Sequence, residues 1–395
     1  MHTQLLEVPP ITNLMVSLTN QCTMRCPFCF VDKDVKRMSY DILMSLFNFT
    51  RRNSELCGIP PRIVFFGGEP MLEWDSLIVP FTKYVREEYN DLCRLSMTTN
   101  LTLLNEERIQ FLKDYNINCL FSIDGAEETM AINRPMSDGS NGFSIVDRNI
   151  DLVVKILGRV SARITLYQPT VKNFFNDVRY VESKAVGSIS VLPNLFDTWS
   201  PETIAEFEKQ IALYESYIID SFRNGRAPLI FQQYAECFYR MMLVNRCMDQ
   251  GLFQTQDRCR GSGKCGFGLG HFATTDYLGD IYGCLHPAPL TRDSIFYLGN
   301  PFDGVDPDKT RRLVEMCDAE TPGGLRCDTC KLRAVCDRGC APNNYIFVGK
   351  MTTPPSIYCH FYRILFDSAI RVAQVLGEEE NSLFKQVFQN RVRLG

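Results

Sequence analysis

Hydrophobic residues along the first half of the chain alternate between two periods. Short apolar runs that end in turn residues predict β-strands. These runs lie at residues 11–19, 62–66, 94–100, 117–123, 162–167 and 188–193. Between them, apolar residues recur three or four positions apart and predict helices at about 39–56, 74–89, 105–115, 143–157 and 171–184. Residues 200–222 add an amphipathic helix that opens with Ser200 and Pro201, a cap residue followed by a favoured first helical residue.

The alternation of strands and helices predicts an α/β fold. Six successive βα units imply a parallel sheet with right-handed crossovers. Because six units are too few to close an eight-stranded barrel, we expect an open, partial (β/α)6 barrel. We assign residues 1–225 to this barrel and residues 226–250 to a helical connection.

The character of the chain changes near residue 250. Residues 251–360 are rich in Gly, Pro and Cys and show little helical periodicity. Such an irregular stretch buries little apolar area, so we expect metal sites to hold it together as a second domain. Residues 361–395 are predicted to close the chain with one or two helices.

Composition narrows the class of protein. The chain has 395 residues, a net charge of −4 and 17 cysteines. No apolar run reaches about 18 residues, so no membrane span is expected, and the acidic balance argues against nucleic acid as a partner. The N-terminus lacks the basic and apolar regions of a signal peptide, which predicts a cytoplasmic protein. In a reducing compartment, clustered thiols more often bind metal than form disulfides.

Three cysteines follow the first predicted strand directly. Cys22, Cys26 and Cys29 have the spacing C-x3-C-x2-C. This loop is expected at the carboxyl edge of the sheet, where barrel folds place their active sites. Three thiolates can hold three irons of a [4Fe–4S] cluster and leave the fourth iron open. The alternative is a structural zinc site with a distant fourth ligand.

With the aromatic Phe28 before the last cysteine, this motif resembles the signature of the radical S-adenosylmethionine (SAM) superfamily. The second strand ends in Gly67-Gly68-Glu69-Pro70, which resembles the GGEP motif of that family. The resemblance implies that the glycines let the backbone approach the SAM amino group and that Glu69 supplies a charged acceptor for it.

Residues at the later strand ends extend the resemblance. In the family, groups at these positions hold the ribose, the carboxylate and the adenine of SAM. The matching residues here are Asn100, Ser122, Asp124, Arg163 and Leu195. Taken singly, Asn100 and Ser122 could equally cap the helices that follow them, and Arg163 could form a surface ion pair. Their placement at successive strand ends favours the SAM site.

The later cysteines form a second pattern. A C-x13-G-x4-C segment precedes C-x2-C-x5-C-x3-C, and a last cysteine follows 18 residues later. With one further cysteine upstream, the pattern resembles the SPASM extension of peptide- and protein-modifying radical SAM enzymes. The resemblance implies two auxiliary [4Fe–4S] clusters, one held by Cys259, Cys265, Cys284 and Cys340, the other by Cys327, Cys330, Cys336 and Cys359. The alternative is two zinc-ribbon-like sites.

Six cysteines receive no role: Cys57, Cys93, Cys119, Cys237, Cys247 and Cys317. For the first three, burial among apolar residues is the default interpretation. Cys317 is an alternative ligand, because it lies near the cluster cysteines in sequence.

The resemblance implies an enzyme that cleaves SAM reductively to a 5′-deoxyadenosyl radical, which abstracts hydrogen from a peptide residue. We expect a C–C or thioether cross-link in a ribosomally made peptide. The alternatives are formylglycine formation in a sulfatase and processing of a cofactor-precursor peptide. In the sulfatase-maturing members, an Asp that serves as a catalytic base directly follows the cysteine that corresponds to Cys284. Here Leu285 occupies that position. A non-catalytic electron carrier is disfavoured, because it needs no SAM motifs.

The resemblance also implies partners. These are a peptide or protein substrate and a flavodoxin- or ferredoxin-type electron donor. Because the first strand begins near residue 11, no N-terminal peptide-recognition domain is expected. Leader recognition would then come from a separate protein or from the barrel. No catalytic base is predicted.

Overall fold

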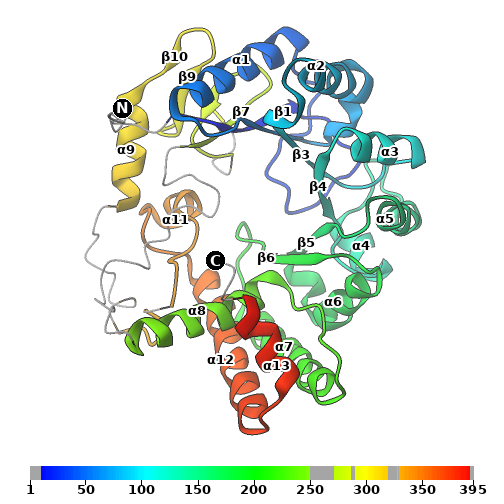
Figure 1. Cartoon of the computed structure of the whole chain (residues 1–395), viewed down its shortest axis with the longest axis vertical. Coiled ribbons are helices and arrows are strands. Elements are labelled where there is room, and N and C mark those ends of the chain that lie inside the picture. The colour runs from blue at the N-terminus through cyan, green and yellow to red at the C-terminus, as the bar shows by residue number, and fades with distance from the viewer. Residues whose placement is uncertain are drawn as a thin grey trace.

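The computed structural model describes residues 10–249, 271–285, 290–318, 327, 329–333 and 335–391. Within these residues, one sheet runs in the order β10-β9-β8-β7-β1-β2-β3-β4-β5-β6 (Figure 1). Its parallel part consists of β1 (Asn13–Thr19), β2 (Arg62–Gly67), β3 (Arg94–Thr99), β4 (Ile117–Ser122), β5 (Ser161–Leu166) and β6 (Ser188–Pro193). The six strands pair in chain order, which confirms the predicted partial (β/α)6 barrel.

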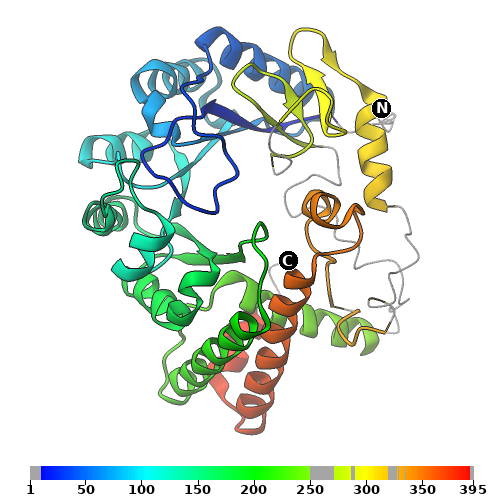
Figure 2. The ribbon, with the colours of Figure 1, turned by 180° about the vertical axis from the view of Figure 1, so that it is seen from behind.

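Helices cover the outer side of this arc of strands, as Figures 1 and 2 show from opposite sides. They are α1 (Tyr40–Cys57), α2 (Val79–Tyr89), α3 (Glu106–Asp114), α4 (Glu127–Asn133), α5 (Phe143–Leu157), α6 (Phe174–Ser183) and α7 (Pro201–Arg223). Ser39 begins α1 because its hydroxyl accepts a hydrogen bond from the Ile42 amide, and Gly58 ends it at φ 71°. The seven-residue α4 was not predicted.

Two predicted helices begin in tighter or wider turns. The segment predicted at 74–89 follows η1 (Pro70–Glu73), a 3₁₀ turn, and starts with η2 (Trp74–Ile78), a π turn, before α2. Pro80 has no amide hydrogen to donate, which favours an irregular start. A second 3₁₀ turn, η4 (Gln168–Asn173), precedes α6, and η3 (Asn90–Leu92) follows α2.

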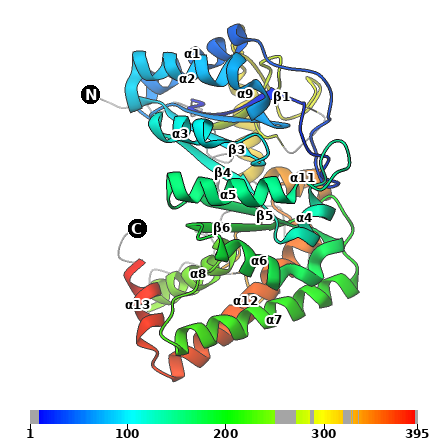
Figure 3. The same ribbon diagram turned by 90° about the vertical axis from the view of Figure 1, so that its right-hand side faces the viewer.

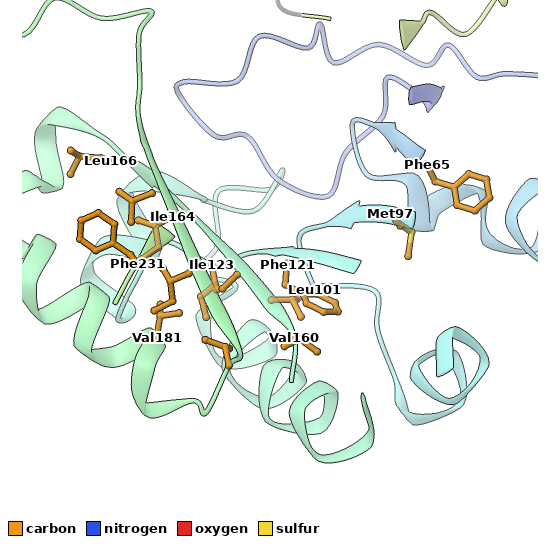
Figure 4. Close-up of a cluster of buried hydrophobic side chains, with 14 of the residues drawn as sticks. Phe65, Met97, Leu101, Phe121, Ile123, Val160, Ile164, Leu166, Val181 and Phe231 are labelled. Atoms are coloured by element: carbon orange, nitrogen blue, oxygen red, sulfur yellow. The ribbon is translucent and has the colours of Figure 1, made fainter. Parts of the chain in front are cut away.

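Burial alternates along the strands. In β5, Ala162, Ile164 and Leu166 are buried, whereas the residues between them are only partly covered. The buried set packs against the helices, and Figure 4 shows part of this core, with Phe65, Met97 and Phe121 from three other strands. The second set lines the inner side of the arc, so polar residues in it face the site.

The second half of the chain completes the sheet and adds helices. Its elements are α8 (Gln232–Asp249), β7 (Phe272–Thr275), β8 (Ile281–Tyr282), β9 (Tyr297–Asn300), β10 (Gly304–Val305), α9 (Pro307–Asp318), α11 (Ala341–Val348), α12 (Ser356–Glu378) and α13 (Ser382–Arg391). β7 pairs in parallel with β1, with Thr274 opposite Met15. Helices α7, α8, α12 and α13 gather at one end of the molecule (Figure 3). Among the described helices, none is long and apolar enough to cross a bilayer.

Candidate functional site

The cysteine loop, which we define as residues 20–38 between β1 and α1, is tied to the end of β2. The Gly68 amide donates to the Thr19 carbonyl at 2.7 Å, and the Glu69 amide donates to the Gln21 carbonyl at 2.8 Å. A Cβ at Gly68 would lie 2.0 Å from the Gln21 oxygen, and one at Gly67 would lie 2.3 Å from the Thr19 oxygen. The close approach predicted for this glycine pair is therefore an approach of the loop backbone itself.

The loop brings its three thiols close to one another. Burial raises the pKa of Cys22, and it raises the pKa of Cys26 to about 11. Neighbouring thiols add to both pKa shifts: Cys29 acts on each of the two, and Cys22 acts on Cys26. Metal binding at Cys22 and Cys26 would therefore release protons from these two thiols.

Each of the three sulfur atoms has its own polar neighbour. The Asn100 amide nitrogen lies 3.6 Å from Cys22 Sγ, and the Lys33 ammonium lies 2.9 Å from Cys29 Sγ. The Arg134 Nη1 atom lies 3.9 Å from Cys26 Sγ. Such donors stabilise negative charge on thiolates in a poorly solvated site. The sequence predicted Asn100 as a SAM contact and gave no signal for Lys33 or Arg134.

Asp124, whose contact with SAM stays a prediction, forms four hydrogen bonds within the protein. Its Oδ1 accepts from Arg134 Nη2 at 2.9 Å and from the Thr165 amide at 2.8 Å. Its Oδ2 accepts from Arg134 Nε at 2.9 Å and from Asn133 Nδ2 at 3.1 Å. All four acceptor positions of the carboxylate are used within the protein, so Asp124 orients Arg134.

Phe28 lies beside the same arginine. The Arg134 guanidinium carbon is 5.4 Å from the centre of the Phe28 ring. Phe28 also meets Tyr167, at the end of β5, edge to face at 5.3 Å. These contacts fix the aromatic ring between the cysteine loop and β5.

The Glu69 carboxylate connects the ends of β2 and β3. Oε1 accepts from the Thr99 hydroxyl at 2.8 Å and from the Met71 amide at 3.1 Å, and Oε2 accepts from the Asn100 amide at 2.8 Å. Burial raises the pKa of Glu69 to about 7, although these hydrogen bonds act to lower it. One acceptor position of the carboxylate remains for the ligand amino group that the sequence predicts.

Ser122 and Arg163 lie side by side on β4 and β5, as the register of the two strands shows. The Arg163 Nε atom is buried, and among the described residues it has no hydrogen-bond partner. Burial lowers the pKa of Arg163, and the nearby Arg134 lowers it further. An unpaired guanidinium beside a hydroxyl suits an anionic ligand such as a carboxylate. Leu195 follows β6 and packs partly buried against the core.

In the cysteine-rich part, Cys336 and Cys359 lie close together. Burial raises the pKa of Cys336 to about 11, and Cys359 contributes to the shift. Asp337 forms an ion pair with Arg240 of α8 and accepts a hydrogen bond from the Tyr358 hydroxyl at 2.5 Å. This network holds the Cys336 loop against α12, the helix that carries Cys359.

The other predicted ligands are placed as follows. Cys330 accepts a contact from Arg363 of α12 at 4.0 Å, and its amide donates to the Cys327 carbonyl. Cys284 is buried after β8, and Cys340 precedes α11. Cys259 and Cys265 lie outside the described residues.

Within the described ranges, no three histidine, cysteine or acidic side chains converge on a single metal-ion position. The ligands of a [4Fe–4S] cluster lie farther apart than those of a single metal ion, because each thiolate binds its own iron. Of the six cysteines without a role, Cys93 and Cys237 are buried in the core.

A cavity of about 350 Å³ lies between the cysteine loop and the strands β7 and β8. Phe30, which follows Cys29, and Leu285, which follows Cys284, both line it. Phe66 and Tyr282 add aromatic rings to the lining, which also holds acidic residues such as Asp276 and the basic residues Lys36 and Arg292. The sequence gave no signal for this cavity, because its walls come from segments that are far apart in the chain.

A partial barrel with three thiols in the loop after β1 is the architecture of radical SAM proteins. Residues 16–173 match the family model of the Radical SAM superfamily. The chain therefore contains a radical SAM domain in this part. The family implies SAM and a [4Fe–4S] cluster as cofactors.

Relatives extend the likeness beyond that domain. The radical SAM cyclopropyl synthase TigE of Paramaledivibacter caminithermalis is 22% identical over 95% of this chain and 76% of its own. The cysteine-type anaerobic sulfatase-maturating enzyme of Clostridium perfringens is 22% identical over 84% of this chain and 89% of its own. The structure of anSMEcpe with bound AdoMet and Cp18Cys peptide covers 94% of this chain and 99% of its own, with a TM-score of 0.71 and 20% identity. This last similarity shows a shared fold.

Proposed function

We propose that this chain modifies a peptide by hydrogen abstraction and forms a C–C or thioether cross-link in it. The observation that carries the proposal is the cavity between the cysteine loop and Leu285. It adjoins the loop that would hold the catalytic cluster on one side and Cys284 on the other. Its volume of about 350 Å³ suits one or two side chains of a peptide.

The residues at the strand ends fit the cofactor pair of the family. Cys22, Cys26 and Cys29 would hold the cluster, and the unpaired Arg163 with Ser122 would hold the SAM carboxylate. When bound, the cluster and SAM supply a 5′-deoxyadenosyl radical, the species that abstracts hydrogen. The chain supplies the cavity in which the peptide would be oriented.

We further propose two auxiliary [4Fe–4S] clusters in the SPASM-like region, which would give three clusters in total. The proximity of Cys336 and Cys359 supports the set formed with Cys327 and Cys330. The second set would combine Cys284 and Cys340 with Cys259 and Cys265. Eight thiolates leave no open iron in either cluster, so electron transfer and structural support are their expected tasks. A flavodoxin- or ferredoxin-type protein would supply the electrons.

Formylglycine formation is the second candidate, supported by the similarity to the sulfatase-maturating enzyme. The side chain of Leu285 opposes it, because a leucine in the cavity wall accepts no proton. The similarity to a cyclopropyl synthase over nearly the whole chain favours C–C bond formation instead.

The release of 5′-deoxyadenosine tests the catalytic proposal. Reconstituted protein with dithionite and SAM is expected to release it, and Cys26→Ala is expected to abolish the release. Cys57→Ala, at the end of α1 and away from the loop, is the control that should retain activity. Equal release by the Cys26→Ala variant would refute the proposal.

The substrate reaction is tested separately by mass spectrometry on a small peptide encoded near the gene. Loss of two hydrogen atoms is expected for a cross-link. Replacement of a cysteine sulfur by oxygen together with loss of two hydrogen atoms would instead support formylglycine formation.

A further inference from the structure

Two of the three sulfur atoms in the cysteine loop have a cationic neighbour, and the two cations differ in how they are compensated. Arg134 reaches Cys26, and Lys33 reaches Cys29. The third sulfur atom, in Cys22, has the neutral amide of Asn100 as its neighbour. Positive charge is therefore distributed unequally around the three sulfur atoms, and one residue accounts for the difference.

The charge of Arg134 is offset locally. Its guanidinium forms a bidentate ion pair with Asp124, and the exposed fractions of the two side chains are 9% and 0%. A buried pair of opposite charges acts on its surroundings mainly as a dipole. Arg134 therefore contributes less net positive potential at the sulfur atoms than its distance to Cys26 suggests.

Lys33 has no such partner. Among the described residues, no carboxylate lies within ion-pair distance of its ammonium group, whose nearest polar contact is Cys29 Sγ at 2.9 Å. The side chain is half-buried, so water screens its charge only in part.

We propose, on the basis of the proposed function, that Lys33 raises the reduction potential of the cluster held by Cys22, Cys26 and Cys29. Reduction transfers one electron from an external donor to the cluster and makes it more negative, without making or breaking a bond in the protein. A cation in contact with one thiolate stabilises this reduced form more than the oxidised form. Lys33 is thus a positioning residue that acts through Cys29 and does not touch the substrate.

The test is a potentiometric titration of the reconstituted holoenzyme followed by electron paramagnetic resonance. The signal that changes on adding SAM reports the catalytic cluster and separates it from auxiliary clusters. At the potential where the wild-type cluster is half reduced, the reduced-to-oxidised ratio of Lys33→Met is expected to fall about tenfold, which equals about 59 mV for one electron. Lys33→Arg keeps the charge and is expected to restore most of this ratio.

Lys36→Met is the matched control. Lys36 lies in the same loop, but its ammonium group pairs with Asp34 at 3.0 Å and its side chain is 53% exposed. Its removal is expected to leave the potential near the wild-type value, because the charge is compensated and screened.

An unchanged potential in Lys33→Met would overturn the inference while leaving the proposed function intact. If Lys33→Met fails to hold its cluster, Lys33→Gln decides, because it keeps a hydrogen-bond donor and removes only the charge. A wild-type potential in Lys33→Gln would then refute the role of the charge. A wild-type protein without a SAM-responsive signal would refute the proposed function and this inference with it.

Discussion

The substitution Asp124→Asn tests whether the buried ion pair beside the cysteine loop is needed for the fold of the site. The Asp124 side chain is fully buried and accepts four hydrogen bonds, two of them from Arg134. An asparagine would leave the Arg134 cation unpaired in a position where its side chain is only 9% exposed. The asparagine would also place its NH2 group, which cannot accept a hydrogen bond, opposite a donor that now faces a carboxylate oxygen.

Removing one partner of a buried ion pair costs about 3–5 kcal/mol, because the remaining charge is stranded away from water. We expect a loss of that size in the free energy of unfolding, a large part of the roughly 5–15 kcal/mol typical of folded proteins. Urea unfolding under anaerobic, reducing conditions measures it, with the fluorescence of the buried Trp74 and Trp199 as the signal.

Two further variants make the test specific. The double variant Asp124→Asn with Arg134→Met removes the stranded cation and is expected to recover about 1–3 kcal/mol relative to the single variant. Asp138→Asn is the control, because Asp138 is exposed and only its contacts to Ser140 are lost, within about 0.5 kcal/mol. A loss below about 1 kcal/mol for Asp124→Asn, or no recovery in the double variant, would refute the reasoning.

Three other predictions concern separate parts of the molecule. Gly68→Ala is expected to lower the free energy of unfolding by about 2–4 kcal/mol and to lower the iron content, because its Cβ would displace the Gln21 backbone. Gly377→Ala in α12, with open space around its Cβ, should be neutral or stabilising by up to about 1 kcal/mol, and equal stability of the two variants would contradict the argument. Burial raises the pKa of Asp177 to about 7, so folding favours the protonated form, and this stabilisation is complete below about pH 4 and lost as pH rises through 7. Unfolding in urea at pH 5.5 and 8 should therefore show a stability decrease in the wild type that is smaller in Asp177→Asn; an equal decrease would speak against burial as the cause. Tyr358→Phe removes the hydroxyl that donates to Asp337 and is expected to cost about 1–2 kcal/mol, measured by thermal unfolding, with no change if that hydrogen bond is unimportant.

Local signals explain how much of the barrel could be predicted from the sequence. Clear periodicity, helped at α7 by the cap residue Ser200, gave the starts of α1, α3, α5 and α7 to within one residue, whereas α2 and α6 begin five and three residues later than predicted. The helix α4 was missed because it has seven residues and its first turn is completed from another element, where Asp177 accepts from the Ala126 amide. Strands β7 to β10 were missed because runs of two to four residues carry no readable period.

The candidate site likewise has a part that the sequence predicted and a part that it did not. Sequence spacing identified the loop cysteines, and topology predicted that polar residues of neighbouring strands would meet, as Ser122 at the end of β4 and Arg163 within β5 do. The donors around the sulfur atoms were not predictable in this way. Arg134 lies 108 residues from Cys26 in the chain, and only the folded structure shows that Asp124 turns it toward the loop.

The pairing of β1 with β7 has a consequence for the synthesis of this protein. Met15 and Thr274 are hydrogen-bonded although 259 residues separate them in the chain. At ribosomal rates of about 5–20 residues per second, roughly 10–50 s pass between the emergence of the two strands. During that interval one edge of the first strand remains without its final neighbour on a nascent chain whose barrel is otherwise ready to form. Factors that shield exposed strand edges on the ribosome should therefore improve the yield of folded enzyme.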